Sequence, residues 1–267
     1  INVFAEGAFL KPGHAPQIGK RSKGIINIDD FDGTQSGYDL RFPPISWALS
    51  SVPEGATQMG NNILLFPEAG LNDDINYGKN RAKIAWYQIE PTLQQYKGSN
   101  NPLSNNAIEL SDPRVRQVYQ REIFPQRTTG FGESLLTTFD LAYYPTDKGP
   151  YNFDEAAGFY SAGVTANGKL ADPKSRWGGL MRSIDQPDFE TANIEFIEFW
   201  MQDPFIDYPA KNLVYPATAG GKLYFNLGNI SEDVLKDGKR FYENGLPTPN
   251  APAPVENSNW GKVPINT

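Results

Sequence analysis

Glycine and proline recur along the whole chain, and this feature restricts the possible fold most strongly. The 267 residues include 25 glycines and 22 prolines. Both residues disfavour helix interiors and are common in turns. A bundle of long helices is therefore disfavoured, and short strands joined by many turns are expected. A chain of this length removes roughly 70–75% of its surface from water on folding, so a substantial core is possible.

Several segments alternate apolar and polar residues with the period of two that is typical of half-buried strands. Two of these strands are predicted to end at Pro91 and Pro145, because proline lacks the backbone donor that a ladder needs. The strands predicted in this way cover residues 1–10, 81–90, 137–145 and 220–230, and the apolar run within 25–29 predicts a further strand that enters a tight, charged loop.

Two helices are predicted from their capping signals. Asp112 is expected to cap a helix over 112–124, with Pro113 at its first position. Ser231 is expected to cap a second helix over 231–245, which has acids in its first turn and ends at Gly245. Both segments carry apolar residues at helical spacing, which predicts amphipathic helices docked on the surface.

Strands separated by turns, with few helices, predict a mainly β protein. We expect an antiparallel β-sandwich, specifically a jelly roll, with a few short surface helices. Residues 97–106 should form an exposed loop, and the proline-rich stretch 247–254 should be extended. The sandwich is expected over 25–246, between a lead-in strand and loop over 1–24 and a proline-rich exit segment over 247–267.

Charge and composition exclude several classes of function. A net charge of −7 argues against a nucleic-acid partner, which requires clustered lysine and arginine. The chain has no cysteine and only one histidine, His14, so a disulfide framework and Cys/His zinc sites are excluded. No stretch approaches the roughly 18 apolar residues of a membrane-spanning helix. We expect this chain to be soluble and, because it starts at Ile1, to be a piece of something larger.

The stretch "IEFIEFW", residues 194–200, raises the question of catalysis because it carries two glutamates. Paired carboxylates are the minimum for acid and base catalysis on sugars. Glu195 and Glu198 are three residues apart, and on a strand an odd separation points two side chains to opposite faces. We therefore interpret them as polar positions in a sheet, and the stretch itself as an inner layer of the sandwich.

Other candidate site residues have a competing structural interpretation. Asp29, Asp30 and Asp32 could bind a structural calcium ion, although the oxygen spacing of an EF-hand is absent and a turn with solvated acids is the favoured interpretation. His14 lies between prolines in an apparent surface turn, and no serine motif accompanies it. A sugar-stacking platform and a core role are both open for the tryptophans at 47, 86, 177, 200 and 260.

A series of sequence blocks resembles one known family. In order, they are "YDLRFPPISWAL", "RAKIAWYQIEP", "REIFPQR", "LAYYPTDKGPYNF", "RWGGLMRSI", "DFETANIEFIEFWMQDPF" and "GKLYFNLGNISEDVLKDGKRFYENGLP". Together they resemble the SprA/Sov family of gliding-motility and type 9 secretion proteins of Bacteroidetes bacteria. The resemblance runs from "INIDDFDG" to "WGKVP", with one departure at Asp32, where the family pattern has glutamate.

The resemblance implies a structural role rather than catalysis. Members of this family are very large outer-membrane proteins whose transmembrane barrel forms the translocon of the type 9 secretion system. This chain would be a non-barrel portion that does not itself span the membrane, and residues 1–24 would lead in from a preceding barrel strand. The implied partners are other secretion components, such as a PorV-like outer-membrane protein, and secreted cargo. The implied place is the cell-surface side of the outer membrane, with the periplasmic side as the alternative. No catalytic residue or cofactor is carried over.

Two other functions remain as alternatives. A carbohydrate-binding jelly-roll module would need exposed, flat aromatic side chains, so burial of Trp47, Trp86, Trp177 and Trp200 would count against it. A glycoside hydrolase would need two carboxyl groups about 5–10 Å apart across one cleft.

Overall fold

The computed structural model describes residues 38–58, 60–126, 134–185, 188–189, 194, 196–238 and 255–264. The chain divides into two compact units, Ile1–Asp39 with Ile184–Phe199, and Leu40–Ser183 with Trp200–Thr267. The described helices and strands all belong to the second unit.

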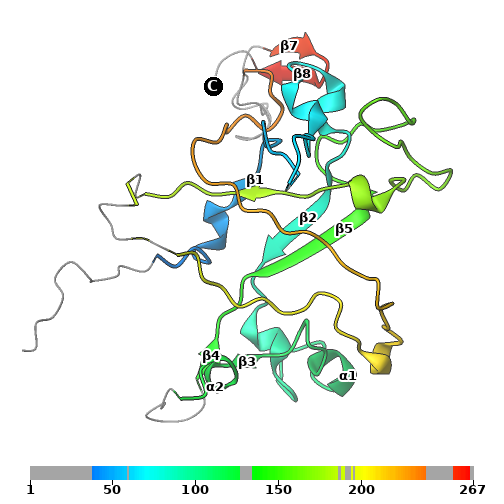
Figure 1. Cartoon of the computed structure of the whole chain (residues 1–267). Helices are drawn as coiled ribbons and strands as arrows, with labels where there is room; N and C mark the ends of the chain where they lie inside the picture. The colour runs from blue at the N-terminus through cyan, green and yellow to red at the C-terminus, as the bar shows by residue number, and fades with distance from the viewer. Residues whose placement is uncertain are drawn as a thin grey trace, which may run out of the picture. The chain divides into compact units, whose positions relative to one another are not determined.

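Short strands in small antiparallel sheets dominate the regular structure of the described residues (Figure 1). This part of the chain is mostly non-helical, which agrees with the mainly β class expected from the sequence. The strands pair two by two: β1 (Ala48–Leu49) with β6 (Leu180–Met181), β2 (Ala82–Tyr87) with β5 (Asp140–Lys148), β3 (Val118–Tyr119) with β4 (Leu135–Leu136), and β7 (Val255–Ser258) with β8 (Gly261–Pro264).

The ladder between β2 and β5 corrects one prediction. Ile84 of β2 faces Tyr143 of β5, and each belongs to the apolar face that the alternating pattern gave its own strand. However, β5 continues through Pro145 to Lys148, so the prediction that this proline ends the strand was wrong. The register shifts at the start of β2, which leaves Pro145 in a bulge where no ladder hydrogen bond is needed. β2 itself ends before Pro91.

Helices in the described part of the chain are single turns. α1 (Ala107–Leu110) and α2 (Gln120–Ile123) are separated by β3, so the single helix predicted over 112–124 was wrong. The Asp112 side chain accepts a hydrogen bond from the backbone N–H of Arg114 at 2.9 Å and so stabilises a turn instead. The 3₁₀ turns are η3 (Pro44–Ser46), η4 (Pro67–Gly70), η5 (Ile75–Gly78), η6 (Pro91–Gln94), η7 (Pro173–Ser175) and η8 (Pro209–Lys211). Most begin with proline, whose fixed φ suits the first helical position.

Three further predicted elements are not formed where the structure describes them. Residues 231–238 contain no helix, and the rest of that predicted helix lies outside the described residues. Residues 220–230 and the described part of 194–200 contain no strand, so "IEFIEFW" is not an inner sheet layer. A correct alternation of side chains does not make a strand by itself, because a strand also needs a neighbour to pair with. The strands predicted over 1–10 and 25–29 and the extended stretch 247–254 lie outside the described residues.

The predicted loop over 97–106 is confirmed, although it is not exposed throughout. It contains turns and no helix or strand. Asn101 is buried, and its side-chain amide donates to the carbonyl oxygens of Leu93 and Gln95 at 2.9 and 2.8 Å. One buried amide therefore fixes the loop from inside.

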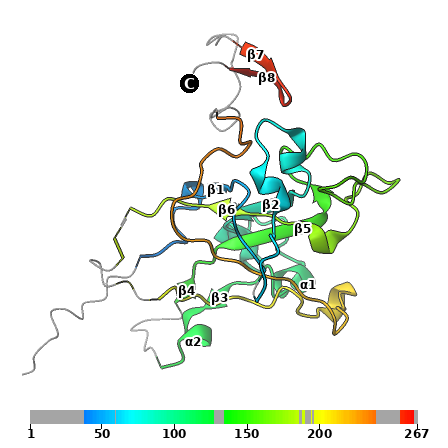
Figure 2. The same ribbon diagram turned by 45° about the horizontal axis from the view of Figure 1, so that its top comes forward.

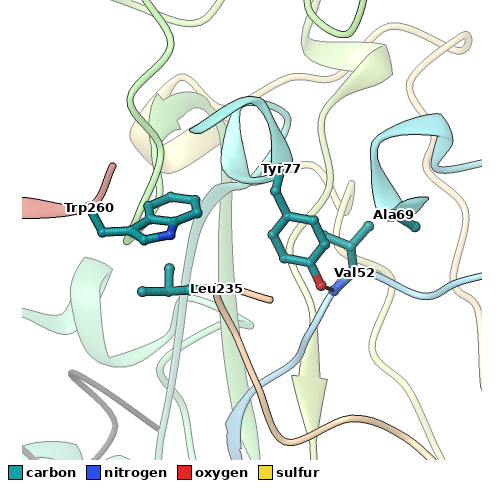
Figure 3. Packing of buried hydrophobic residues seen from close by; sticks show 5 residues of the cluster. All are labelled: Val52, Ala69, Tyr77, Leu235 and Trp260. Atoms are coloured by element: carbon teal, nitrogen blue, oxygen red, sulfur yellow. Dashed lines mark hydrogen bonds between the residues drawn. The ribbon is translucent and has the colours of Figure 1, made fainter. Parts of the chain in front are cut away.

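The hydrophobic core of the second unit brings together residues far apart in the sequence (Figure 3). Its buried members are Val52, Ala69, Tyr77, Leu235 and Trp260. The hydroxyl of Tyr77 accepts a hydrogen bond from the backbone N–H of Val52 at 2.9 Å, which satisfies its polar end inside the core. Half-buried side chains pack around this cluster, among them Phe66, Leu71, Ile75, Tyr151 and Trp177.

Candidate interaction surface

Most of the candidate site residues singled out from the sequence lie outside the described residues. These are His14, Asp29, Asp30, Asp32 and Glu195. Glu198 is exposed in the first unit. In the part of the chain that the structure describes, no group of three or more acidic or histidine side chains is placed to hold a metal ion. The calcium site and the opposed directions of Glu195 and Glu198 therefore stay predictions.

The tryptophans divide into a buried or half-buried set and one exposed residue. Trp260 is in the core. Three tryptophans are half-buried, and each indole N–H donates a hydrogen bond. The bond from Trp47 goes to the carbonyl oxygen of Leu40 and the bond from Trp86 to that of Pro44. The bond from Trp177 goes to the Glu68 carboxyl group. Trp200 is 73% exposed. A platform built from several of these side chains is therefore not formed.

A strip of large apolar side chains lies on the surface of the second unit between residues 223 and 230. We call it the apolar strip, and it consists of Leu223, Tyr224, Phe225, Leu227 and Ile230. Each of these side chains is 43–58% exposed. Figures 1 and 2 show this part of the chain, in orange after η8, as a tube without helix or strand. Single exposed apolar residues are ordinary, but five exposed large ones within eight consecutive residues mark a candidate interaction site.

Residues 196–200 of "IEFIEFW", the stretch predicted as an inner sheet layer, are also exposed. In the first unit the exposed side chains include Phe196, at 68%, and Ile197. In the second unit Trp200 and Met201 continue this pattern. The ring of Trp200 meets that of Phe124 edge to face, with ring centroids 6.4 Å apart. Phe196, Ile197, Phe199 and Trp200 of "IEFIEFW" are thus exposed in the same way as the apolar strip.

The chain before the apolar strip is anchored to α1 by η8. The Lys211 ammonium group bonds to the carboxylates of Glu109 and Asp112, the latter at 2.7 Å. The hydroxyl of Tyr208 donates to the carbonyl oxygen of Ile108 at 2.6 Å. Burial works to raise the pKa of Asp112, but the hydrogen bond from Lys211 and the N–H of Arg114 outweigh it and hold this pKa below its ordinary value.

The chain after the apolar strip is anchored in the core. The Leu235 side chain is buried in the hydrophobic cluster. The Lys236 ammonium group bonds to the carbonyl oxygen of Ala69 and to Glu54, and its own carbonyl accepts from the N–H of Asp73 at 3.0 Å. The strip is therefore held firmly at both ends while its own side chains face solvent.

A buried arginine supports the second anchor. Arg81 is 1% exposed and donates to the carbonyl oxygens of Ser50 and Val234 at 2.7 and 3.4 Å. Its guanidinium carbon lies 4.7 Å from the ring centroid of Trp177, which is a cation–π contact. Burial lowers the pKa of Arg81 to about 10, so it stays charged at neutral pH.

Sequence reasoning found both apolar segments but predicted 220–230 as a half-buried strand and "IEFIEFW" as an inner sheet layer. Their alternation predicted strands that the described residues do not form, because alternation alone does not show whether a segment has a strand to pair with or a face that is covered. The anchors were missed entirely, because nothing in the local pattern pairs Lys211 with Asp112 or Arg81 with Val234.

No family model matches this chain, and no curated protein matches it either. Among the described residues, the helices are too short and too polar to cross a membrane.

Proposed function

We propose that this chain is a non-catalytic structural and interaction module of a SprA/Sov-like outer-membrane translocon, which supports type 9 protein secretion and gliding motility. Its partners are other components of that system, such as a PorV-like protein, and passing cargo. It belongs on the cell-surface side of the parent protein. In its assembled state the module completes an antiparallel sandwich of the jelly-roll kind.

One observation supports this proposal most directly. Both sequence blocks that carry the resemblance furthest, "DFETANIEFIEFWMQDPF" and "GKLYFNLGNISEDVLKDG", expose several large apolar side chains among their described residues. Fully burying a leucine or phenylalanine side chain is worth about 1.5–3 kcal/mol. An exposed set anchored at both ends therefore gains stability when a partner covers it, which is the behaviour expected of a module within a larger assembly.

A carbohydrate-binding module is the second candidate, and Trp200 is the observation in its favour. This indole is the most exposed of the described tryptophans and lies beside Phe124. Exposed aromatic faces are what sugar rings stack on, but one indole gives a small contact area compared with the apolar strip.

The interaction role is tested by making the strip polar in the full-length parent protein. We expect Leu223→Ser combined with Leu227→Ser to reduce cargo secretion and gliding speed at least about tenfold, because truncating side chains at the centre of an interface costs about 2 kcal/mol or more. The unfolding midpoint of the purified chain should stay unchanged, since both side chains are exposed.

Phe159→Ser is the matched control. Phe159 is 89% exposed and lies outside the blocks that carry the resemblance. Secretion and gliding should be normal in this variant. Normal secretion in the strip variant, or an equal loss in both, would contradict the proposal.

A further inference from the structure

The main chain of the apolar strip runs without a turn. Residues 221–227 contain no turn and no bend, and the first bend follows at Gly228, whose φ is +122°. Figures 1 and 2 draw this stretch as part of the orange tube. Successive side chains of an extended segment point to opposite faces, so Leu223 and Leu227 share one face and Tyr224 belongs to the other.

Within the described part of the chain, four residues of this stretch have backbone groups without hydrogen-bond partners. The N–H and carbonyl groups of Leu223, Tyr224, Asn226 and Leu227 bond to no other described residue. Every residue from 221 to 230 is also exposed. A row of unpaired N–H and carbonyl groups is a template for pairing with another strand. The strip therefore offers a partner main-chain donors and acceptors as well as apolar side chains.

The strip has what a strand needs except a neighbour. In the same unit, β2 is a strand because β5 lies beside it. Alternating side chains stabilise a strand only when a neighbour supplies ladder hydrogen bonds and one face is covered. The anchors at Lys211 and Leu235 restrain the strip before any partner arrives, which lowers the ordering cost of binding.

Lys222, at the start of the strip, indicates the charge that a neighbouring strand would carry. Its ammonium group forms no ion pair or hydrogen bond with another described residue, and the residue is exposed. Opposite charges that face each other across two strands stabilise the pairing. A carboxylate on the neighbouring strand, opposite Lys222, is therefore the complementary group.

A second copy of this chain does not supply that carboxylate. Antiparallel self-pairing that sets Leu223 against Leu227 also sets Lys222 against Gly228. The register that would set Lys222 against Glu232 of a second copy runs through Gly228, where the chain bends. Charge complementarity therefore favours a different protein as the neighbour.

We propose that the apolar strip binds by strand addition, in which residues 221–227 pair with the open edge of a β-sheet in another protein. The edge strand of that sheet alternates apolar residues and carries a carboxylate opposite Lys222. Main-chain hydrogen bonds supply the affinity and alternate side chains the specificity. The inference rests on the proposed function, because it takes the apolar strip as the interface and names the kind of surface that the partner presents.

Proline substitutions test the main-chain role, because proline removes one N–H donor. In a ladder the N–H groups of alternate residues point to the neighbour, so only one of positions 223 and 226 donates to the partner. Leu223→Pro is compared with Leu223→Ala, and Asn226→Pro with Asn226→Ala. The two members of each pair lose the same natural side chain, so their difference reports the N–H group.

We expect one of the two proline variants, and not the other, to reduce secretion by the full-length parent protein at least about tenfold relative to its alanine counterpart. The reason is that a carbonyl group of the partner is buried without its donor. The unfolding midpoint of the purified chain should not fall in either proline variant, because neither N–H group bonds to another described residue.

Three outcomes would overturn strand addition. One is equal secretion within both proline–alanine pairs, and another is an equal loss at both positions, because proline would then disturb the path of the chain rather than one donor. The third is a lowered unfolding midpoint in a proline variant, which would show that its N–H group is already bonded in the free chain.

The charge and the identity of the neighbour are tested separately. We expect Lys222→Glu to reduce secretion more than Lys222→Gln, and equal secretion by these two variants would contradict the facing carboxylate. Sedimentation of the purified chain should show a monomer. A dimer that dissociates in one proline variant would make a second copy the neighbour and overturn the proposal.

Failure of this inference is distinguishable from failure of the proposed function. Normal secretion by the variant that combines Leu223→Ser with Leu227→Ser would remove the interface itself. A loss in that variant, without any difference within the proline–alanine pairs, would keep the interface and remove only the strand addition.

Discussion

At the scale of single residues, the most unusual group is the buried Glu68 carboxyl. It is 1% exposed, and its Oε1 accepts hydrogen bonds from Asn80 at 3.1 Å and Trp177 at 3.2 Å. Its Oε2 has no hydrogen-bond partner among the described residues. Burial raises the pKa of Glu68, and the hydrogen bonds and the charge of Arg81 only partly oppose this. Folding therefore shifts the equilibrium of this carboxyl group toward its protonated form relative to the unfolded chain.

This gives a prediction for the pH dependence of stability. The folded chain binds the Glu68 proton more tightly than the unfolded chain does. The resulting stabilisation is complete below the ordinary pKa of 4.5 and is lost as the pH rises through the raised value. We expect Glu68→Gln, which keeps the amide oxygen as an acceptor, to flatten this dependence and to be at least as stable as the natural chain at pH 8.

Urea unfolding of both proteins from pH 4.5 to pH 8 checks this prediction. The outcome that contradicts it is a variant that is clearly less stable at pH 8, because that would make the charged carboxylate the necessary counter-ion of Arg81.

At the scale of elements, the irregular segments are joined by a fully buried ion pair. Arg176, the residue that ends η7, lies 2.9 Å from the Asp154 carboxylate, and both side chains are 0% exposed. The same guanidinium donates to the carbonyl oxygens of Lys79, Gly163 and Ala171 at 2.7–2.9 Å. One side chain thereby connects four segments that share little regular structure, and this compensates for the short sheets.

Removing one partner of this pair should be costly. Asp154→Asn leaves the Arg176 charge buried without its counter-charge, and we expect a loss of about 3–5 kcal/mol in the free energy of unfolding. Asp147→Asn is the matched control, because Asp147 bonds to the exposed Lys169 at the surface. The control should unfold at the same urea concentration as the natural chain. Equal effects of the two changes would contradict the account of the buried pair.

The elements also show what could be predicted from the sequence and what could not. The strand predicted at β2 is confirmed, because this alternating segment has a strand to pair with, β5. The helix over 112–124 failed because Asp112 stabilises a local turn and binds Lys211, far along the chain. The extent of β5 was underestimated because a bulge accommodates Pro145. Capping signals and alternation are local, whereas bulges, ion pairs and strand partners depend on distant residues.

At the scale of the whole molecule, the buried core cluster and the buried Arg81 of the second unit hold one end of the exposed apolar strip. The core cluster and Arg81 fix Val234, Leu235 and Lys236 after the strip. The Lys211 network fixes η8 before it. The apolar residues of the strip were identifiable from the sequence, but their exposure was not, because alternation does not reveal whether a face is covered.

The central claim is that the apolar strip contacts another component of a secretion assembly, and site-specific photo-cross-linking in cells tests it most directly. A photoreactive amino acid would replace Leu223 in the parent protein, and Phe159 would carry it in the control. We predict one discrete protein adduct from position 223, identified by mass spectrometry as an outer-membrane secretion component, and none from position 159. Capture of glycan alone, or the same products from both positions, would contradict the claim.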